Sequence, residues 1–373
     1  MKIIFICGSL ESGKDGVGDY TRRLCGELIN QGIAVGMLSY NDKHICKSIE
    51  ETQFSDANSI PCYRLSSHLK SKKRCNEAKK WVEANNPEWL SLQFVPYAYN
   101  DRGLTAGLWS QLKKIGCNRK WHIMFHELWI GKSVSYSFKN RFYRFLQEKS
   151  IKRLNNNLSA ECKHTHLPFY QRVLNSNLKP LPLFSNINND NSPNELKYFN
   201  SVIIGFFSQV SLHISIVSFI KAINEQIVLQ NKKLVIKLIG GNKKRNEQFE
   251  KYIKELVHGN IDVEITGFLD SIKLSSQLKS CDLGLTIVPR HALGKSGSVA
   301  AFISHGVPVA APVVLKDYKT MDIGFFNSKL KLAILTKPDL LLIKEKKKAA
   351  IDSKDLVSLS KITTIFLRDL NIK

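Results

Sequence analysis

A glycine-rich segment that follows the first apolar run has residue types and spacing suited to phosphate chemistry. Residues 8–24 read GSLESGKDGVGDYTRRL. Gly8, Gly13 and Lys14 have the spacing of a Walker A loop, G-x-x-x-x-G-K-[ST], but Asp15 stands where the magnesium-binding hydroxyl belongs. A carboxylate there would repel phosphates, and we find no apolar strand ending in aspartate that would complete an ATPase site. The segment therefore argues against a P-loop ATPase.

The same segment is also a weak match to a dinucleotide-binding turn. Gly16 and Gly18 supply G-x-G, Thr21 replaces the third glycine, and Asp42 follows the second apolar strand at a plausible distance. The remaining interpretation is a glycine-rich turn at Gly16 and Gly18 that brings backbone amides and a helix N-terminus close to an anion. We expect Asp19 to cap that helix.

A second candidate phosphate site lies in the stretch KSGSVAAFISHG, residues 295–306. It begins with a cation and a turn of small residues and then has a helical pattern, so its first backbone amides could meet a diphosphate. Positive side chains close by would stabilise a leaving diphosphate. The residues predicted for this role are Arg290, Lys295, Ser296, Gly297 and Ser298. The alternative is an ordinary αβ unit whose glycines make tight turns.

His126 lies at the carboxyl end of the apolar run KWHIMFHEL, where side chains of a parallel sheet face the ligand. It could hydrogen-bond a sugar or orient an acceptor, although a histidine at a strand end is often structural. Glu127 and Asp19 are candidate bases, provided that they reach the reacting hydroxyl. Trp129 could stack on a sugar ring or fill the core.

Composition indicates a globular protein with two domains. The chain has 373 residues, of which 43% are apolar and 23% charged. No apolar run approaches the ~20 residues that span a bilayer, and MKIIFICGSL lacks a signal-peptide cleavage site, so we expect a buried strand and a cytoplasmic protein. Eight cysteines without a C-x-x-C pair predict free thiols and argue against zinc. We expect neither a metal nor a cofactor.

The formal net charge of +23 is shared by both halves of the chain. Such charge suits nucleic acid, anionic lipid or polyanionic substrates, or reflects a lysine-rich proteome. Residues 138–154, FKNRFYRFLQEKSIKRL, mix phenylalanines with lysines and arginines, as in a helix resting on an anionic membrane; the cluster at 70–74 could contribute. The alternative is a core helix with a solvated basic face. No nucleic-acid-binding module is recognised, so no nucleic-acid partner is expected.

Apolar strands alternate with amphipathic helices, which predicts an α/β protein with parallel sheets. The pattern stops in the Asn-rich segment 185–200 and then restarts. We predict an N-terminal Rossmann-like domain at 1–184, a linker at 185–200, a second Rossmann-like domain at 201–350, and a C-terminal helix at 351–373 that packs back on the first domain. Strands are expected at 2–9, 33–40, 89–96, 120–128, 201–208, 233–241, 263–269, 281–289 and 308–314, with helices at 19–32, 71–85 and 102–115.

A series of short segments in this order resembles the GT-B glycosyltransferases of the family-four type. They are DGVGDYTRRL at 15–24, LQFVPY at 92–97, FHELW at 125–129, LPLFSNI at 181–187, ITGFL at 265–269, and CDLGLTIVP with SGSVAAFISHGVPVAAP at 281–312. The resemblance spans most of the chain and implies two Rossmann-like domains facing across a cleft.

The resemblance also implies an activity. It implies a metal-independent, hexosyltransferase-like enzyme that moves a sugar, with retention, from a nucleotide-sugar to a glycan or lipid-linked acceptor in surface polysaccharide or glycolipid synthesis. The donor would bind mainly to the C-terminal domain and the acceptor to the N-terminal domain. The donor-binding residues then include Gly16, Gly18 and Gly205. Gly267, Phe268 and Leu269 would meet the nucleobase, although TGFL could equally be an ordinary strand end. The expected location is cytoplasmic, with peripheral contact at the inner membrane face.

The sequence departs from the family pattern at two places. Where retaining members carry a Glu-x7-Glu pair, this chain has Leu293 and Ala301, and Gln209 and His213 replace the usual Arg and Lys after the first strand of the second domain. Two alternatives therefore stay open: a weakly active or idle GT-B homologue that acts as a binding partner in a glycan-assembly complex, and a nucleotide-sugar epimerase, which shares the fold.

Overall fold

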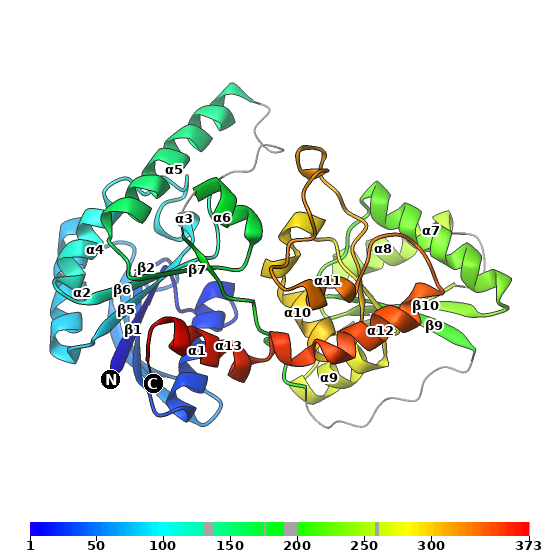
Figure 1. Cartoon of the computed structure of the whole chain (residues 1–373), viewed down its shortest axis with the longest axis horizontal. Coiled ribbons are helices and arrows are strands. Elements are labelled where there is room, and N and C mark those ends of the chain that lie inside the picture. Colours follow the sequence, from blue (N-terminus) through cyan, green and yellow to red (C-terminus); the bar gives the residue numbers. More distant parts are fainter. Residues whose placement is uncertain (130–136, 175–176, 190–199, 258–260, 373) are drawn as a thin grey trace. The chain divides into compact units, whose positions relative to one another are not determined.

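The computed structural model (Figure 1) describes residues 1–129, 137–174, 177–189, 200–257 and 261–372. The chain divides into two compact units: Met1–Leu181 together with Thr363–Lys373 form unit 1, and Pro182–Ile362 form unit 2. Most of the predicted linker at 185–200 lies outside the described residues.

Unit 1 is built on an eight-stranded sheet in the order β3-β4-β2-β1-β5-β6-β7-β8. All its neighbouring strands are parallel except the antiparallel pair β3 and β4. The four predicted strands are present, and β3, β4, β7 and β8 are additions. The strands are β1 Lys2–Cys7, β2 Ala34–Asp42, β3 Ile49–Ser55, β4 Asn58–Ser66, β5 Trp89–Phe94, β6 Lys120–Phe125, β7 Cys162–Thr165 and β8 Lys179–Pro180.

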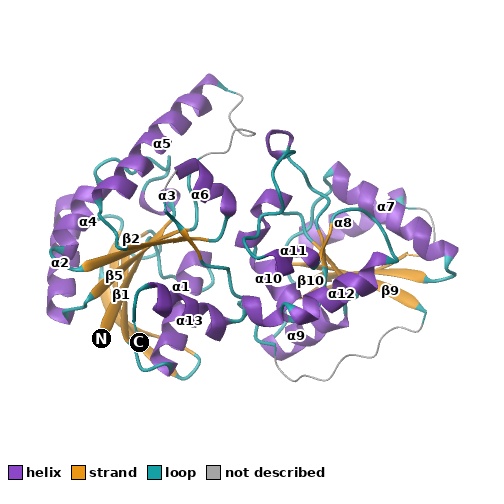
Figure 2. Ribbon diagram, in the orientation of Figure 1, coloured by secondary structure: helices purple, strands orange, loops and turns teal. Residues whose placement is uncertain are grey.

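Helices cover both faces of this sheet (Figure 2), which is why its central strands β1 and β5 are mostly apolar and are buried along almost their whole length. One face packs against α2, α4 and α5, and the other carries Phe5 against Phe366 of α13, with ring centroids 5.9 Å apart. The helices are α1 Gly16–Asn30, α2 Ser71–Asn85, α3 Pro96–Tyr99, α4 Leu108–Gly116, α5 Phe138–Asn157, α6 Pro168–Leu174 and α13 Leu359–Asp369, whose residues from Thr363 onward belong to unit 1.

Unit 2 is built on a six-stranded parallel sheet in the order β11-β10-β9-β12-β13-β14. Its strands are β9 Ser201–Phe207, β10 Lys233–Ile239, β11 Ile261–Gly267, β12 Leu283–Leu285, β13 Val309–Ala310 and β14 Ile334–Leu335. Its helices are α7 Ile214–Leu229, α8 Lys243–Leu256, α9 Ser271–Ser280, α10 Gly297–Ser304, α11 Ser328–Leu332 and α12 Leu342–Asp352, with 3-10 turns at Arg290–Lys295, Lys316–Tyr318 and Lys354–Val357.

Each sheet has a point where the strand order reverses, between β1 and β5 in unit 1 and between β9 and β12 in unit 2. Open α/β sheets bind ligands outside the carboxyl ends of the strands at such points. In unit 1 the short helix α3 occupies this place. It packs so closely on Gly8, after β1, that a Cβ added to Gly8 would overlap Ala98 of α3. In unit 2 the corresponding place is open.

Among the residues that the structure describes, no helix combines the length and the apolar character needed to cross a membrane. All eight cysteines are free thiols, and only Cys46 and Cys117 are exposed.

Candidate functional site

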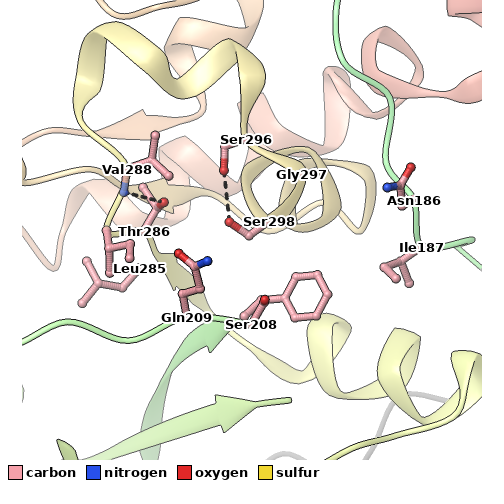
Figure 3. A pocket seen from close by; sticks show the side chains of 12 residues that line it. Asn186, Ile187, Ser208, Gln209, Leu285, Thr286, Val288, Ser296, Gly297 and Ser298 are labelled. Atoms are coloured by element: carbon pink, nitrogen blue, oxygen red, sulfur yellow. Dashed lines mark hydrogen bonds between the residues drawn. The ribbon is translucent and has the colours of Figure 1, made fainter. Parts of the chain in front are cut away.

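A cavity of about 390 Å³ opens at the carboxyl ends of β9 and β12 in unit 2 (Figure 3). Its size is in the range of small-ligand sites. Four segments form it: residues 186–187, the end of β9 with the residues after it, the end of β12 with the residues after it, and the start of α10. The residues that line it are Asn186, Ile187, Phe207, Ser208, Gln209, Leu285, Thr286, Ile287, Val288, Ser296, Gly297 and Ser298.

The N-terminus of α10 forms one wall of the cavity. Ser296 is the N-cap, and its hydroxyl accepts a hydrogen bond from the Val299 amide at 3.3 Å and lies 3.1 Å from the hydroxyl of Ser298. Gly297 is exposed, and nothing lies within 4 Å of the place where a Cβ would be. Unpaired amides and the helix dipole favour an anion at such a terminus.

The two strand ends form the floor. Ser208 has a φ of 70° and turns the chain away from β9, while Gln209 extends toward the same space as Ser296 and Ser298 (Figure 3). After β12, the Thr286 hydroxyl accepts a hydrogen bond from the Val288 amide at 3.2 Å. In the described part of the chain, no residue that lines the cavity has a charged side chain.

Ser296, Gly297 and Ser298 are the predicted donor-site residues that line this cavity. Lys295 immediately precedes them, at the end of the 3-10 turn, but does not line the cavity. Gln209 lines the cavity, whereas His213 caps α7, its Nδ1 accepting the Ser215 amide at 3.2 Å.

Arg290, a predicted diphosphate-binding residue, does not line the cavity. Its Nε donates to the carbonyl of Ala311 at 2.7 Å, and its Nη2 donates to the carbonyl of Thr336. These carbonyls follow β13 and β14, so the guanidinium ties together the ends of two strands.

Gly205, also predicted to bind the donor, does not line the cavity and is closely packed. It lies inside β9, is buried, and a Cβ there would approach the Cys281 sulfur to 2.5 Å. Gly267 ends the edge strand β11, and Phe268 and Leu269 follow it; none of the three lines the cavity, and Phe268 is 99% exposed. Leu293 and Ala301, which replace the Glu pair, are buried in the apolar core.

In the glycine-rich segment of unit 1, a side-chain carboxylate occupies the place where a phosphate was expected. The Asp15 carboxylate caps α1 and accepts hydrogen bonds from the amides of Val17 at 2.8 Å and Gly18 at 3.2 Å. A phosphate would have to displace this carboxylate, so the expected anion site at Gly16 and Gly18 is already filled. Gly18 serves close packing, because a Cβ there would lie 2.7 Å from the Ser9 carbonyl oxygen.

Asp19 is not the cap, contrary to the prediction, because α1 begins earlier, at Gly16. Its carboxylate pairs with Arg22 at 2.6 Å and accepts the Gly13 amide at 3.1 Å. It therefore holds the turn before α1, and a role as base would require that ion pair to open.

Asp42 cannot serve as the ribose-binding acid of a dinucleotide site. Its side chain has no exposed surface, and Arg64 Nε donates to it at 2.8 Å. The hydroxyls of Ser9 and Ser39 donate to it as well, each at 3.2 Å. The NAD interpretation therefore has no acid available at the expected place.

His126 directly follows β6, as predicted, but it is 7% exposed and both ring nitrogens have partners. Nε2 lies 2.9 Å from Gln93 Oε1, and Nδ1 lies 3.2 Å from His166 Nε2. Direct contact with a sugar would require one of these bonds to break. Glu127 is half-buried beside it, and Trp129 packs against the core of unit 1.

The sequence does not single out Gln93, although it lies in the segment LQFVPY, and His166 belongs to none of the motifs. Only strand pairing brings β5, β6 and the end of β7 together. The sequence also does not single out Asn186 and Thr286. Thr286 follows β12, so its place after a central strand was a usable signal.

No protein-family model matches this chain, and no curated protein matches it significantly. Solved structures match it over its whole length. A glycosyltransferase from Rickettsia africae is 14% identical with a TM-score of 0.58, covering 100% of this chain and 99% of that one. The lipopolysaccharide outer core galactosyltransferase WaaB, in its apo form, is 13% identical, with the same TM-score and coverage. A UDP-GlcNAc 2-epimerase from Methanocaldococcus jannaschii is 12% identical with a TM-score of 0.53, also covering 100% and 99%.

Proposed function

We propose that this chain, which has the GT-B fold of two Rossmann-like domains, is a glycosyltransferase that takes a sugar from a nucleotide-sugar. The observation that carries the proposal is the open cavity of unit 2. It lies at the strand-order reversal, and the N-terminus of α10 forms one of its walls. A nucleoside diphosphate needs such a place, since its charge lies on the diphosphate and its sugar and base need space on either side.

The diphosphate would bind at the start of α10. Backbone amides of Gly297 and Ser298, with the hydroxyls of Ser296 and Ser298, would replace the usual Arg and Lys clamp, and Lys295 would add charge from the adjoining turn. Because no charged side chain lines the cavity in the described part of the chain, we expect weaker diphosphate binding than a clamped site provides. The nucleobase would lie toward Gly267–Leu269, as the family resemblance implies.

The acceptor would bind to unit 1 and react with retention and without a metal. Glu127 is the candidate base; His126 would act through the hydrogen bonds it already makes. We further propose that the acceptor is lipid-linked and that α5 contacts an anionic membrane surface. In the first half of α5, Phe138, Phe142 and Phe145 are 85%, 54% and 59% exposed and lie among Lys139, Arg141 and Arg144.

The first experiment tests the cavity. Gly297→Asp places a negative charge at the start of α10, in open space and at a residue without positive φ, so the fold should tolerate it. The charge should repel a diphosphate. We expect titration calorimetry with UDP, GDP, CDP and their sugars to show binding of one nucleotide by the wild type, weakened about 10- to 100-fold in the variant.

Ser271→Asp is the matched control, because it adds the same charge to the exposed first residue of α9 in the same unit, away from the cavity. It should bind as the wild type does. Equal binding by Gly297→Asp would place the nucleotide elsewhere. No binding of any nucleotide by the wild type would favour the idle homologue.

The epimerase is the second candidate, because solved epimerase structures share the fold over the whole chain. Incubation with the bound nucleotide-sugar in the absence of acceptor, followed by proton NMR, separates the two. Appearance of an epimer would replace the transferase proposal.

A further inference from the structure

A chain of hydrogen bonds crosses the interior of unit 1 from the end of α13 to the carbonyl of Leu181. Its bonds are 2.7–3.2 Å long. All the side chains between its two ends are buried. In order, the groups are Asp369, His164, His122, Ser91, Gln93, His126, His166 and the Leu181 carbonyl.

Both ends of this chain are acceptors, the Asp369 carboxylate and the Leu181 carbonyl oxygen. Every bond needs one hydrogen, and a neutral imidazole brings only one. The Gln93 amide divides the chain, because its Nε2 donates to Ser91 at 2.8 Å while its Oε1 lies 2.9 Å from His126 Nε2 and accepts from it.

On the Asp369 side, neutral rings satisfy every bond. Gln93 donates to Ser91, the Ser91 hydroxyl donates to His122 Nδ1, His122 Nε2 donates to His164 Nδ1, and His164 Nε2 donates to Asp369. Burial lowers the pKa of His122 well below its ordinary value, and burial outweighs Asp369 in lowering that of His164. Both effects keep these two rings neutral.

On the other side, neutral rings leave one bond without a hydrogen. Three bonds link Gln93 Oε1, His126, His166 and the Leu181 carbonyl, but two neutral imidazoles bring only two hydrogens. We propose that the His126–His166 pair holds one further proton as a shared imidazolium, and that Gln93 is the positioning residue that keeps it there.

Burial opposes a charge on this pair, as it does on His122, so the shared proton depends on the hydrogen bonds to acceptors at both ends. Tyr20 of α1 presents its ring at 5.0 Å from His126 and 5.8 Å from His166, both edge to face, and burial raises its pKa, so it stays neutral. His122 is the nearest other titratable ring in the chain of bonds, and Glu127 follows His126 in sequence. The oxygens of Gln93 and Leu181 accept the two outer hydrogens and so stabilise the cation from both ends.

The pair would hold this proton whether or not the chain transfers sugar. It lies after β6 and β7, at the carboxyl edge of the sheet, which is where an acceptor would bind under the proposed function. There the imidazolium would attract an anionic group of the ligand, and Gln93 would affect activity only through the proton that it holds in place.

The test is long-range proton–nitrogen NMR of the full chain with ¹⁵N-labelled histidine at pH 7.5, where an ordinary histidine is largely neutral. Variants His166→Asn and His164→Asn assign the rings. We expect a doubly protonated signature from the His126–His166 pair and neutral Nε2–H rings for His122 and His164. Four neutral rings, or an imidazolium at His122 or His164, would overturn the proposal.

Two variants of neighbouring β5 residues provide the contrast. Gln93→Met removes the acceptor, so two bonds remain for two neutral rings and the extra proton should disappear at pH 7.5. Ser91→Ala breaks the chain on the Asp369 side only, so the imidazolium should persist. A general packing defect would affect both alike, and that result would count against Gln93 as the positioning residue. If Gln93→Met does not fold, the wild type and Ser91→Ala still decide.

Discussion

At the residue scale, the buried ion pair of Asp42 and Arg64 holds the loop that follows β1. Arg64 is also paired with Glu11 in that loop and lies 3.4 Å from Glu51 of β3. Burial alone would raise the pKa of Asp42, but hydrogen bonds from Arg64 and from the amides of His44 and Leu10 outweigh it, so the pKa lies below its ordinary value. The charged form is therefore part of the folded state.

We expect Asp42→Asn to lower the free energy of unfolding at pH 7 by about 3 kcal/mol, because it leaves Arg64 buried without its strongest partner. Since the folded pKa is lowered, the contribution of Asp42 is present above the unfolded pKa of about 3.9 and is lost as pH falls through the folded value. Urea unfolding at pH 7 measures the loss. Asp101→Asn, at an exposed ion pair with Lys43, is the control and should change little.

The buried ring of His122 should make stability depend on pH in the neutral range. Its lowered pKa means that the unfolded state binds a proton below about pH 6.5 while the folded state does not. Stability is thus present above that pH and falls as the solution becomes more acidic. We expect His122→Asn to reduce the loss of stability between pH 6.5 and 5.5 by about 1 kcal/mol, since an unfolded histidine is only half protonated at pH 6.5. An unchanged slope in urea unfolding would mean that His122 is protonated in the fold.

At the element scale, α5 differs from the other helices that cover its face of the sheet. Its residues 138–146 include none that is buried, whereas Gln147, Ile151 and Leu154 anchor its second half. In Figures 1 and 2 the first half of this helix extends beyond the rest of unit 1. Exposed phenylalanines among cations suit the interface of an anionic bilayer.

We expect Phe142→Ser combined with Phe145→Ser to reduce binding to vesicles that contain anionic phosphatidylglycerol about tenfold, through the loss of buried aromatic area in the interface. Vesicle co-sedimentation at low and physiological salt measures it. The control is Phe54→Ser on the edge strand β3, where Phe54 is 64% exposed and outside α5. Equal losses in both variants would contradict the membrane role of α5.

At the scale of the whole molecule, the chain returns at its C-terminus to complete unit 1. Phe366 is fully buried, lies 5.9 Å from Phe5 of β1, and meets His122 edge to face at 5.0 Å. Asp369 forms the end of the buried hydrogen-bond chain. The first and last segments of the sequence therefore share one core.

We expect Phe366→Ala to destabilise unit 1 by about 3–5 kcal/mol, the usual result of removing a buried phenylalanine. Hydrogen exchange followed by mass spectrometry should show faster exchange in β1, β5 and β6 and little change in β9 and β10. Phe302→Ala, at a fully buried residue of α10, should show the reverse. Faster exchange in both units from Phe366→Ala would contradict separate cores.

The strands that can be predicted from the sequence are those with a continuous apolar run. Central strands such as KIIFIC are buried on both faces, so their apolar runs are visible without a structure. The short or polar strands were missed: β3 is mostly exposed at an edge, and β8 and β14 have two residues each. Such strands form because a neighbouring strand pairs with them, and their own residues show little preference for the strand conformation.

The α/β class, the two alternating halves and the turn of small residues at Ser296–Ser298 can be predicted from the sequence, because they depend on local spacing. The partners of the charged and polar side chains depend on the tertiary fold. Asp15 caps a helix, Arg290 joins two strand ends, and His126 is enclosed by Gln93 and His166. A side chain's partner comes from strand order and burial, and a motif carries no information about a group that lies far away in sequence.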